Sequence, residues 1–407
     1  MNRNDRTIVG LTMLAHAMVH TYELSFPIFL TVWLSEFHTT TGTLGIVVGV
    51  GYALFGIGAL PGGVLSDSYG SRSLIVLCLL GMAGSFLLLS VAPTLAVVAL
   101  ALVLWGISAS VYHPSGLALL SKGVSERGSA FAYHGMAGNF GIAFGPLATT
   151  LLLLVFDWRT VVGILAIPAL IAAFLAFRTE IDESAAVEGQ ETRADGGVSS
   201  LSEFFTTSRM LFAGWFVVVF GIVMMSGLYY RGVLTFLPDL LGQLPMFAPV
   251  AFAGESLQPA RYLYAGLLTV GMAGQYVGGK LTDRVKNAHG IAASFGILAI
   301  IALVFVPASN AGLVPLLAVS FVLGFFLFVV QPLYQATVAE YTPPEARGIS
   351  YGYTYLGVFG VGALGATIAG VVLQYFSPTV LFAVLAGFAV VASLLGTLLS
   401  IRGPSAS

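Results

Sequence analysis

The chain has 407 residues, of which 57% are hydrophobic and only 8% are charged, and its mean hydropathy is +0.95. Soluble proteins carry about 25% charged residues, so this composition excludes a water-soluble enzyme. The net charge of -2 does not indicate a partner, but the sequence has no basic groove for nucleic acid, so we expect no nucleic-acid partner and a lipid bilayer around the chain.

Long charge-free stretches predict the membrane-spanning helices. Residues 73–121, 287–339 and 348–401 contain no Asp, Glu, Lys or Arg. Because about 20 apolar residues cross the hydrocarbon core, each stretch holds two spans. Continuous rather than alternating apolar runs favour helices over a β-barrel. Twelve transmembrane helices are predicted near residues 8–33, 43–65, 73–91, 95–120, 129–155, 159–177, 210–238, 262–281, 290–307, 311–338, 348–374 and 378–401.

One long polar and acidic insert divides these helices into six and six. We expect an N-terminal bundle over residues 1–178, a cytosolic linker over 179–208 and a C-terminal bundle over 209–407. The halves also repeat each other, because GGVLSD at 62–67 recurs as GGKLTD at 278–283. The fold class is therefore an all-α membrane protein of two pseudo-symmetric six-helix bundles.

The basic residues predict the orientation. With the N-terminus in the cytosol, 13 of the 16 Lys and Arg side chains fall on the cytosolic side. This distribution follows the positive-inside tendency. We expect a multi-pass protein of the cell membrane with both termini in the cytosol.

Ionisable side chains within the spans of the first half are candidate functional groups, because burying them in a membrane is costly. His16, His20 and Glu23 are spaced i, i+4 and i+7, so they share one face of the first helix. His113 lies in the fourth helix and His134 in the fifth. Together they form a candidate ladder of proton-exchanging groups. Two alternatives are a metal site on the same residues and a purely structural role in packing. We predict no metal site, because no Cys or second carboxylate accompanies these residues within the membrane.

In the second half, Arg231 is the only basic residue deep in a span, and Tyr230 precedes it. It aligns with Glu23 between the repeats, which predicts that the two side chains pair, or that Arg231 binds an anionic group. Pro114 and Pro332 occupy matching helices and predict bends, which point to a site nearby. The further candidates for substrate binding are Asn139, Gln331, Tyr334 and Gln335.

Two glycine-rich motifs carry a family resemblance. The segment GGVLSDSYGSR resembles the G-x-L-x-D-x-x-G-x-R loop of the major facilitator superfamily, and a second copy follows at 278–284. GIAFGP at 141–146 resembles the G-x-x-x-G-P element of its proton-coupled antiporters. The resemblance implies that these segments gate the transporter, and that the glycine-rich helices meet between the halves. The implied gating residues are Gly63, Asp67, Gly70, Arg72, Gly145, Pro146, Asp283 and Arg284.

A finer resemblance is to the fosmidomycin-resistance-like branch of drug exporters. It rests on HAMVHTYELSFP in the first helix, Tyr112-His113-Pro114 in the fourth, and the Arg-Gly entry to the fifth. The family implies a secondary transporter that works by alternating access, and we predict proton-coupled antiport that exports a small organic solute.

Other functions remain as alternatives at this stage. They are proton-coupled uptake of an organic anion, metal-ion transport, and a membrane enzyme or receptor without transport. No nucleotide-binding loop is present, so no cofactor is predicted, and we expect a monomer.

Overall fold

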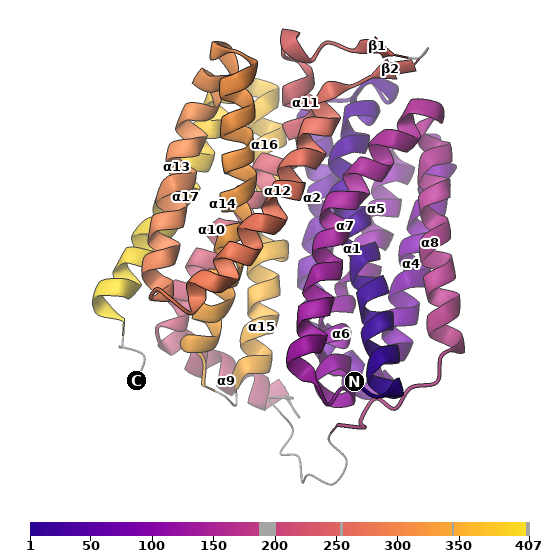
Figure 1. The fold of residues 1–407 in the computed structure, drawn as a ribbon, viewed down its shortest axis with the longest axis vertical. Helices are drawn as coiled ribbons and strands as arrows, with labels where there is room; N and C mark the ends of the chain where they lie inside the picture. Colours follow the sequence, from indigo (N-terminus) through magenta and orange to yellow (C-terminus); the bar gives the residue numbers. More distant parts are fainter. Residues whose placement is uncertain (187–200, 253–254, 344–345, 404–407) are drawn as a thin grey trace. The chain divides into compact units, whose positions relative to one another are not determined.

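The computed structural model describes residues 1–186, 201–252, 255–343 and 346–403, and these are mostly helical (Figure 1). The elements of the first half are α1 (Arg3–Glu36), α2 (Thr41–Ile57), α3 (Ala59–Tyr69), α4 (Ser71–Ser90), α5 (Leu95–Ser110), α6 (Tyr112–Gly123), α7 (Arg127–Val155) and α8 (Trp158–Arg178). Those of the second half are α9 (Leu201–Ala213), α10 (Phe216–Leu234), α11 (Leu237–Gly242), η1 (Pro245–Phe247), β1 (Val250–Phe252), β2 (Glu255–Leu257), α12 (Pro259–Thr282), α13 (Asn287–Ala311), α14 (Leu313–Glu340), α15 (Arg347–Tyr355), the π-helical η3 (Leu356–Val361), α16 (Leu364–Tyr375) and α17 (Pro378–Arg402).

Among the described residues, ten helical segments are long and apolar enough to cross a membrane. The helices α1 and α12 are as long, with 34 and 24 residues, but more polar. Together they account for the twelve predicted spans. Four predicted runs are interrupted. In three of them α2 gives way to α3 near Gly58, α5 to α6 near Val111, and α15 to α16 through η3. The run 210–238 is divided among α9, α10 and α11.

The chain divides into two compact units. The first unit comprises Met1–Phe37 and Val50–Gly197, and the second comprises His38–Gly49 and Val198–Ser407. Residues 187–200 of the predicted linker lie outside the described residues, and α9 begins before the predicted end of that linker.

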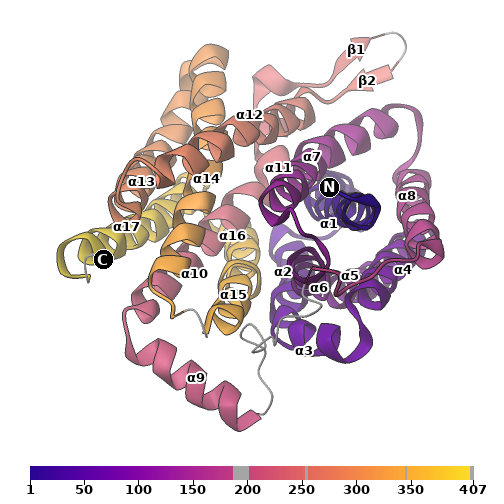
Figure 2. The ribbon, with the colours of Figure 1, turned by 60° about the horizontal axis from the view of Figure 1, so that its bottom comes forward.

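In the first unit, α1 packs against α4, α6, α7 and α8, which surround it in Figure 2. The closest approach is to the glycine face of α7. A Cβ atom on Gly141 would lie 2.2 Å from the Ala17 carbonyl oxygen, and one on Gly145 would lie 2.5 Å from that of Thr21. The predicted close approach of helix backbones is thus confirmed. Gly138, Gly141 and Gly145 all face α1. The expectation that the glycine-rich helices meet between the halves stays a prediction.

In the second unit, α10 packs against η3, α16 and α17. Gly227 permits the contact, because a Cβ atom there would lie 2.4 Å from the Val358 carbonyl oxygen. A short antiparallel hairpin, in which Val250 pairs with Leu257, precedes α12 and has no counterpart among the predicted elements.

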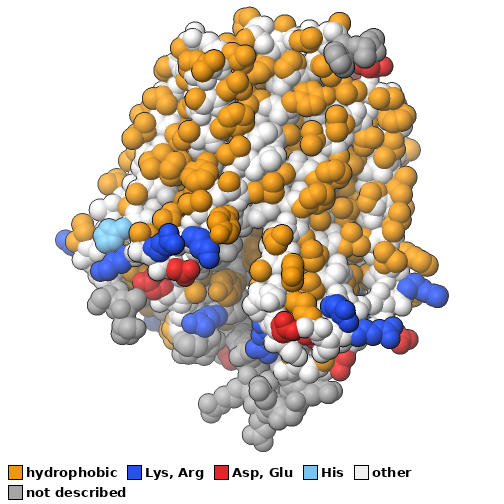
Figure 3. Space-filling model, in the orientation of Figure 1, with side chains coloured by type: hydrophobic (Ala, Val, Ile, Leu, Met, Phe, Trp, Pro, Cys, Tyr) orange, Lys and Arg blue, Asp and Glu red, His pale blue; other side chains and the backbone are white. Residues whose placement is uncertain are grey.

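Charged and apolar side chains separate on the surface of each unit. Figure 3 shows hydrophobic side chains over most of the visible face, with most of the visible Lys, Arg, Asp and Glu side chains near its lower edge. Exposed apolar side chains such as Leu77, Leu100 and Leu303 are about 60% accessible. Such an apolar belt is the surface that lipid requires.

Candidate functional site: a buried network of histidine and glutamate

The polar face of α1 lies inside the first unit. His16 and His20 are each 8% exposed, and Glu23 is 1% exposed. One face of the helix carries all three, as the spacing predicts. Their side chains also contact one another, which spacing alone does not establish. The predicted polar ladder is therefore a buried network within one unit.

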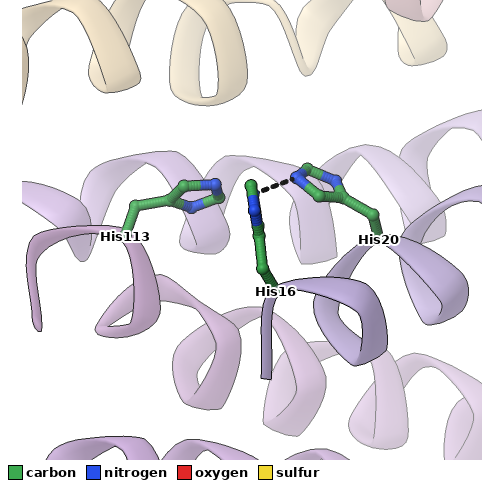
Figure 4. A group of neighbouring side chains, drawn as sticks. All are labelled: His16, His20 and His113. Carbon is green, nitrogen blue, oxygen red and sulfur yellow. Dashed lines mark hydrogen bonds between the residues drawn. The ribbon is translucent and has the colours of Figure 1, made fainter. Parts of the chain in front are cut away.

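The break between α5 and α6 brings His113 to the same place. The α-helix ends at Ser110 and a new one begins at Tyr112, with Pro114 in its first turn, where a missing N–H costs least. The His113 ring stands perpendicular to that of His16, with centroids 5.3 Å apart, and lies 5.5 Å from that of His20. In Figure 4 the His16 ring stands between the other two. The matching Pro332 lies within α14, which continues through it.

Three hydrogen bonds join the network of His16, His20 and Glu23. His16 Nδ1 lies 2.7 Å from the backbone carbonyl oxygen of His134. His20 Nε2 lies 3.0 Å from His16 Nε2, and His20 Nδ1 lies 2.5 Å from Glu23 Oε2. Because a carbonyl oxygen only accepts, His16 Nδ1 must donate.

His134 completes the surroundings of His16 from α7. Its ring stacks on that of His16 with centroids 3.9 Å apart. Its Nε2 lies 3.2 Å from the hydroxyl of Tyr112, which itself donates to the carbonyl oxygen of Thr12 at 2.5 Å. With that hydrogen used, the Tyr112 oxygen accepts from His134 Nε2, so Nε2 carries the His134 proton. Apart from its place before His113, nothing in the sequence marks Tyr112 as a partner of this group.

The number of hydrogens in the network follows from these contacts. Each of the three hydrogen bonds needs one hydrogen, whereas two neutral imidazoles supply only two. The third hydrogen is therefore an additional proton, carried either by the Glu23 carboxyl group or by one of the two imidazole rings. The network is thus neutral overall, and removing that proton leaves one of the three contacts without a hydrogen.

In the second unit, Arg231 lies between aromatic rings. Its side chain is buried, and its guanidinium carbon lies 5.6 Å from the ring centroids of both Tyr230 and Phe359. Phe359 belongs to η3, and π-helical turns recur at functional sites. Sequence reasoning missed Phe359, because neither its type nor its spacing marks a π-helical turn. Since Glu23 and Arg231 belong to different units, their pairing stays a prediction.

The remaining candidates for substrate binding lie on α7 and α14. Asn139 is half-buried and follows Gly138, whose missing side chain leaves room for the His16 ring. On α14, Gln331 is half-buried, Tyr334 is buried and Gln335 is exposed.

The loop of residues 62–72 is fastened by an acidic side chain that sequence reasoning missed. Gly70 adopts φ +81°, the left-handed conformation that favours glycine. The next two backbone N–H groups, of Ser71 and Arg72, donate to the carboxylate of Glu183 at 2.8 and 3.0 Å. Glu183 therefore occupies the positive N-terminal end of α4. The acidic excess of the linker was visible in the sequence, but nothing singled out this position.

Other gating candidates have varied surroundings. The Arg72 guanidinium donates to the carbonyl oxygens of Ala176 and Phe177 at the end of α8. A Cβ atom on Gly63 would meet open space, and the side chain of Asp67 lies outside the described part of the chain. Pro146 is buried within α7. In the second copy, Asp283 caps the C-terminus of α12, and Arg284 lines a surface cavity of about 320 Å³ with Lys280 and Tyr276.

Comparison with known proteins identifies a family and two relatives. The sequence profile of the Major Facilitator Superfamily matches residues 10–366 and 243–407. A puromycin resistance protein, pur8, of Streptomyces alboniger is 36% identical over 121 residues, which are 29% of this chain and 24% of that protein. An uncharacterized MFS-type transporter, YfnC, of Bacillus subtilis strain 168 is 25% identical over 295 residues, 70% of this chain and 66% of that one. The chain thus spans less than two thirds of the length of each.

Solved structures share the fold. A bacterial homolog of the human lysosomal transporter Spinster, in an inward-facing and unoccupied conformation, has a TM-score of 0.73 at 14% identity over 98% of this chain and 96% of that one. A D-xylose-proton symporter has a TM-score of 0.72 at 15% identity over 97% of each chain. The nucleoside transporter NupG has a TM-score of 0.72 at 14% identity over 96% of this chain and 99% of that one. At identities of 14–15%, the likeness to these structures shows a shared fold alone.

Proposed function

Because the chain belongs to the Major Facilitator Superfamily, we propose that it exports a small organic compound across the cell membrane by proton-coupled antiport. Its fold and family make it a membrane transporter rather than an enzyme. The family works by alternating access, so the coupling ion and the cargo must each be bound and released on both sides. The proposal therefore needs a proton site, a cargo site and a gate.

The observation that carries the proposal is the hydrogen-bonded network of His16, His20 and Glu23. Its three contacts hold one proton more than two neutral imidazoles supply. When that proton leaves, two acceptors face each other, and a buried polar contact without its hydrogen costs about 1–3 kcal/mol. Loss of the proton therefore favours a different arrangement of these side chains. This dependence links protonation to the conformation around α1, as antiport requires.

Each candidate then has a role. Glu23 and His20 exchange the proton, while His16, His113 and His134 form the surrounding relay. We assign the cargo site to Arg231, Tyr230, Asn139, Gln331, Tyr334 and Gln335. The gate is assigned to Gly63, Asp67, Gly70, Arg72, Gly145, Pro146, Asp283 and Arg284. The linker of residues 179–208 and both termini are placed in the cytosol, and the working form is a monomer.

The export direction is supported by a relative's name. A relative matched over 121 residues is called a puromycin resistance protein. Resistance by a transporter is achieved when the compound leaves the cell. We therefore take puromycin as the first candidate cargo. The resemblance to the fosmidomycin-resistance-like branch is a second reason to propose export, and fosmidomycin is the second compound to test.

Everted membrane vesicles test the proposal. Respiration acidifies the lumen of such vesicles, and a pH-sensitive dye reports the gradient. If the protein exchanges protons for cargo, adding puromycin or fosmidomycin releases luminal protons and restores dye fluorescence. Vesicles with Glu23→Gln protein should show no restoration. Restoration of equal size with this variant would overturn the role of Glu23, and no response across a broad compound panel would overturn antiport.

A second candidate function is proton-coupled uptake of an organic anion. It is favoured by one observation, the buried Arg231 guanidinium between Tyr230 and Phe359. A guanidinium in such a setting suits a carboxylate or phosphate. Uptake predicts that an inward pH gradient concentrates a labelled anion inside right-side-out vesicles, whereas antiport depletes it.

A further inference from the structure

The rings of His16 and His20 are oriented in the way that metal-bound histidines usually are. A metal-binding imidazole offers one nitrogen to the ion and donates from the other to a backbone carbonyl or a carboxylate. His16 donates from Nδ1 to the His134 carbonyl oxygen, and His20 Nδ1 contacts Glu23 Oε2. Both Nε2 atoms consequently point to the same place, 3.0 Å apart.

A third imidazole reaches this place from another helix. His113, on α6, brings a ring nitrogen close enough that one nitrogen from each of the three rings lies within 4.8 Å of the others. All three side chains are buried, and Figure 4 shows the His16 ring between the other two. We call His16, His20 and His113 the histidine cluster.

We propose that the histidine cluster binds one divalent transition-metal ion of the zinc type. Imidazole nitrogens suit zinc, and three protein ligands with one open position form a common zinc site. With Zn–N bonds of about 2.0–2.1 Å, tetrahedral ligands lie about 3.4 Å apart, so the His16 and His20 nitrogens need to separate by only a few tenths of an ångström. The His113 nitrogen lies within 4.8 Å of the other two, so it needs to approach by at most about 1.4 Å to reach that separation. Glu23 and the His134 carbonyl then act as the outer partners that fix the two rings.

The metal ion and the proton of the network compete for the same position, between His16 Nε2 and His20 Nε2. The proton between the two Nε2 atoms leaves when the ion takes their lone pairs, so one ion enters and one proton departs. The proposal rests on the orientation of the rings and their outer partners, and it holds whether or not the protein performs antiport. It departs from the sequence-based expectation because the spacing on one helix did not reveal that His113 supplies a third ligand.

Cobalt titration of the purified protein tests the site. The full chain, carrying an affinity tag without histidine and treated with chelator, is titrated in detergent with Co²⁺, and bound Co²⁺ is then displaced with Zn²⁺. We expect visible bands of a tetrahedral site that saturate at one equivalent and disappear with Zn²⁺. Glu23→Gln, which replaces the outer carboxylate with a neutral amide that accepts more weakly from His20 Nδ1, should weaken affinity about 10–100-fold.

The six histidines of the chain provide matched variants. His16→Ala, His20→Ala and His113→Ala should each weaken Co²⁺ affinity at least tenfold, whereas the double variant His38→Ala, His289→Ala should bind as the wild type. His113→Gln tests the same ligand with a polar side chain if His113→Ala does not fold, and size-exclusion profiles confirm folding. Absence of the bands in the wild type, or binding unchanged in the cluster variants, would overturn the metal site. Because no gradient or cargo is involved, failure here leaves the antiport proposal standing, and failure of transport leaves this result standing.

Discussion

His16 and His20 face each other through their Nε2 atoms, 3.0 Å apart, while the Nδ1 atom of each ring is held by a hydrogen bond. A hydrogen between the two Nε2 atoms makes this approach favourable, because two unprotonated nitrogens would face each other as acceptors. The arrangement depends on three side chains of α1, those of His16, His20 and Glu23, and on the backbone carbonyl of His134 on α7. The predictions below test those contacts and the packing that supports them.

The network should contribute measurably to stability. Replacing His20 with alanine leaves Glu23 and His16 Nε2 without the contacts that His20 makes. We expect the free energy of unfolding to fall by about 1–3 kcal/mol, the usual cost of a buried polar group that loses its partner. Chemical unfolding in detergent measures the change. The control is His38→Ala, at the end of α1; equal effects of the two substitutions would contradict the network.

The glycine face of α7 should tolerate no side chain against α1. In Gly141→Ala, the new Cβ atom would lie 2.2 Å from the Ala17 carbonyl oxygen, so the two helices must separate. Overpacking of this kind costs about 1–3 kcal/mol. Thermal unfolding of the purified protein reports it. Gly135→Ala is the matched control on the same helix, because its Cβ atom meets nothing within 4 Å; a loss of stability as large as that of Gly141→Ala would refute the packing argument.

The planar shape of the Arg231 guanidinium, in addition to its charge, should contribute to cargo affinity. In Arg231→Lys the charge stays, but the planar group between Tyr230 and Phe359 is lost. We expect cargo affinity to drop about tenfold, equivalent to about 1.4 kcal/mol. Binding of labelled cargo to purified protein measures it, with Arg261→Lys as the control. Unchanged affinity would remove Arg231 from the cargo site.

Glu183 should stabilise the loop that precedes α4. Its carboxylate accepts from the N–H groups of Ser71 and Arg72, in the position of an N-terminal cap. Removing such a cap costs about 0.5–2 kcal/mol, so Glu183→Ala should lower the unfolding temperature. The exposed Glu180 provides the control, Glu180→Ala. If the two variants unfold at the same temperature, the capping role is wrong.

Asp157 gives a prediction of pH dependence outside the membrane spans. Hydrogen bonds from the side chain and backbone of Thr160 hold the pKa of the Asp157 carboxyl below its ordinary value of 3.8. A lowered pKa in the folded protein means that the ionised cap stabilises α8 above the ordinary pKa and that this contribution disappears as the pH falls through the folded pKa. The difference in unfolding temperature between wild type and Asp157→Ala should therefore shrink below about pH 4. A difference that grows on acidification would contradict the sign.

Much of the fold was predictable because the membrane imposes it. Charge-free stretches fixed the spans, and the glycine spacing of α7 indicated a close helix contact. The partner of that contact, α1, was not predicted, because a stripe of small residues indicates close packing without indicating which helix packs there. The division of α2 from α3 also escaped, since the apolar run continues across it, whereas Pro114 predicted a bend near the point where α5 gives way to α6.

The candidate site was predictable in part for a similar reason. Spacing placed His16, His20 and Glu23 on one face, and their rarity in a membrane marked them as functional. The contacts of His113 and of the His134 carbonyl depend on how α6 and α7 pack against α1, which no periodicity encodes. Glu183 and Phe359 were missed because their roles arise from a linker and a π-helical turn whose paths the sequence does not reveal.

The most direct test of the central claim is proton release by purified protein in liposomes. A pH dye inside the vesicles reports protons that leave when a cargo gradient is imposed, with wild type, Glu23→Gln and the exposed Glu36→Gln compared at equal protein density. Proton-coupled antiport predicts cargo-dependent proton movement in wild type and Glu36→Gln and none in Glu23→Gln. Equal proton movement in all three proteins, or cargo movement without protons in the wild type, would contradict it.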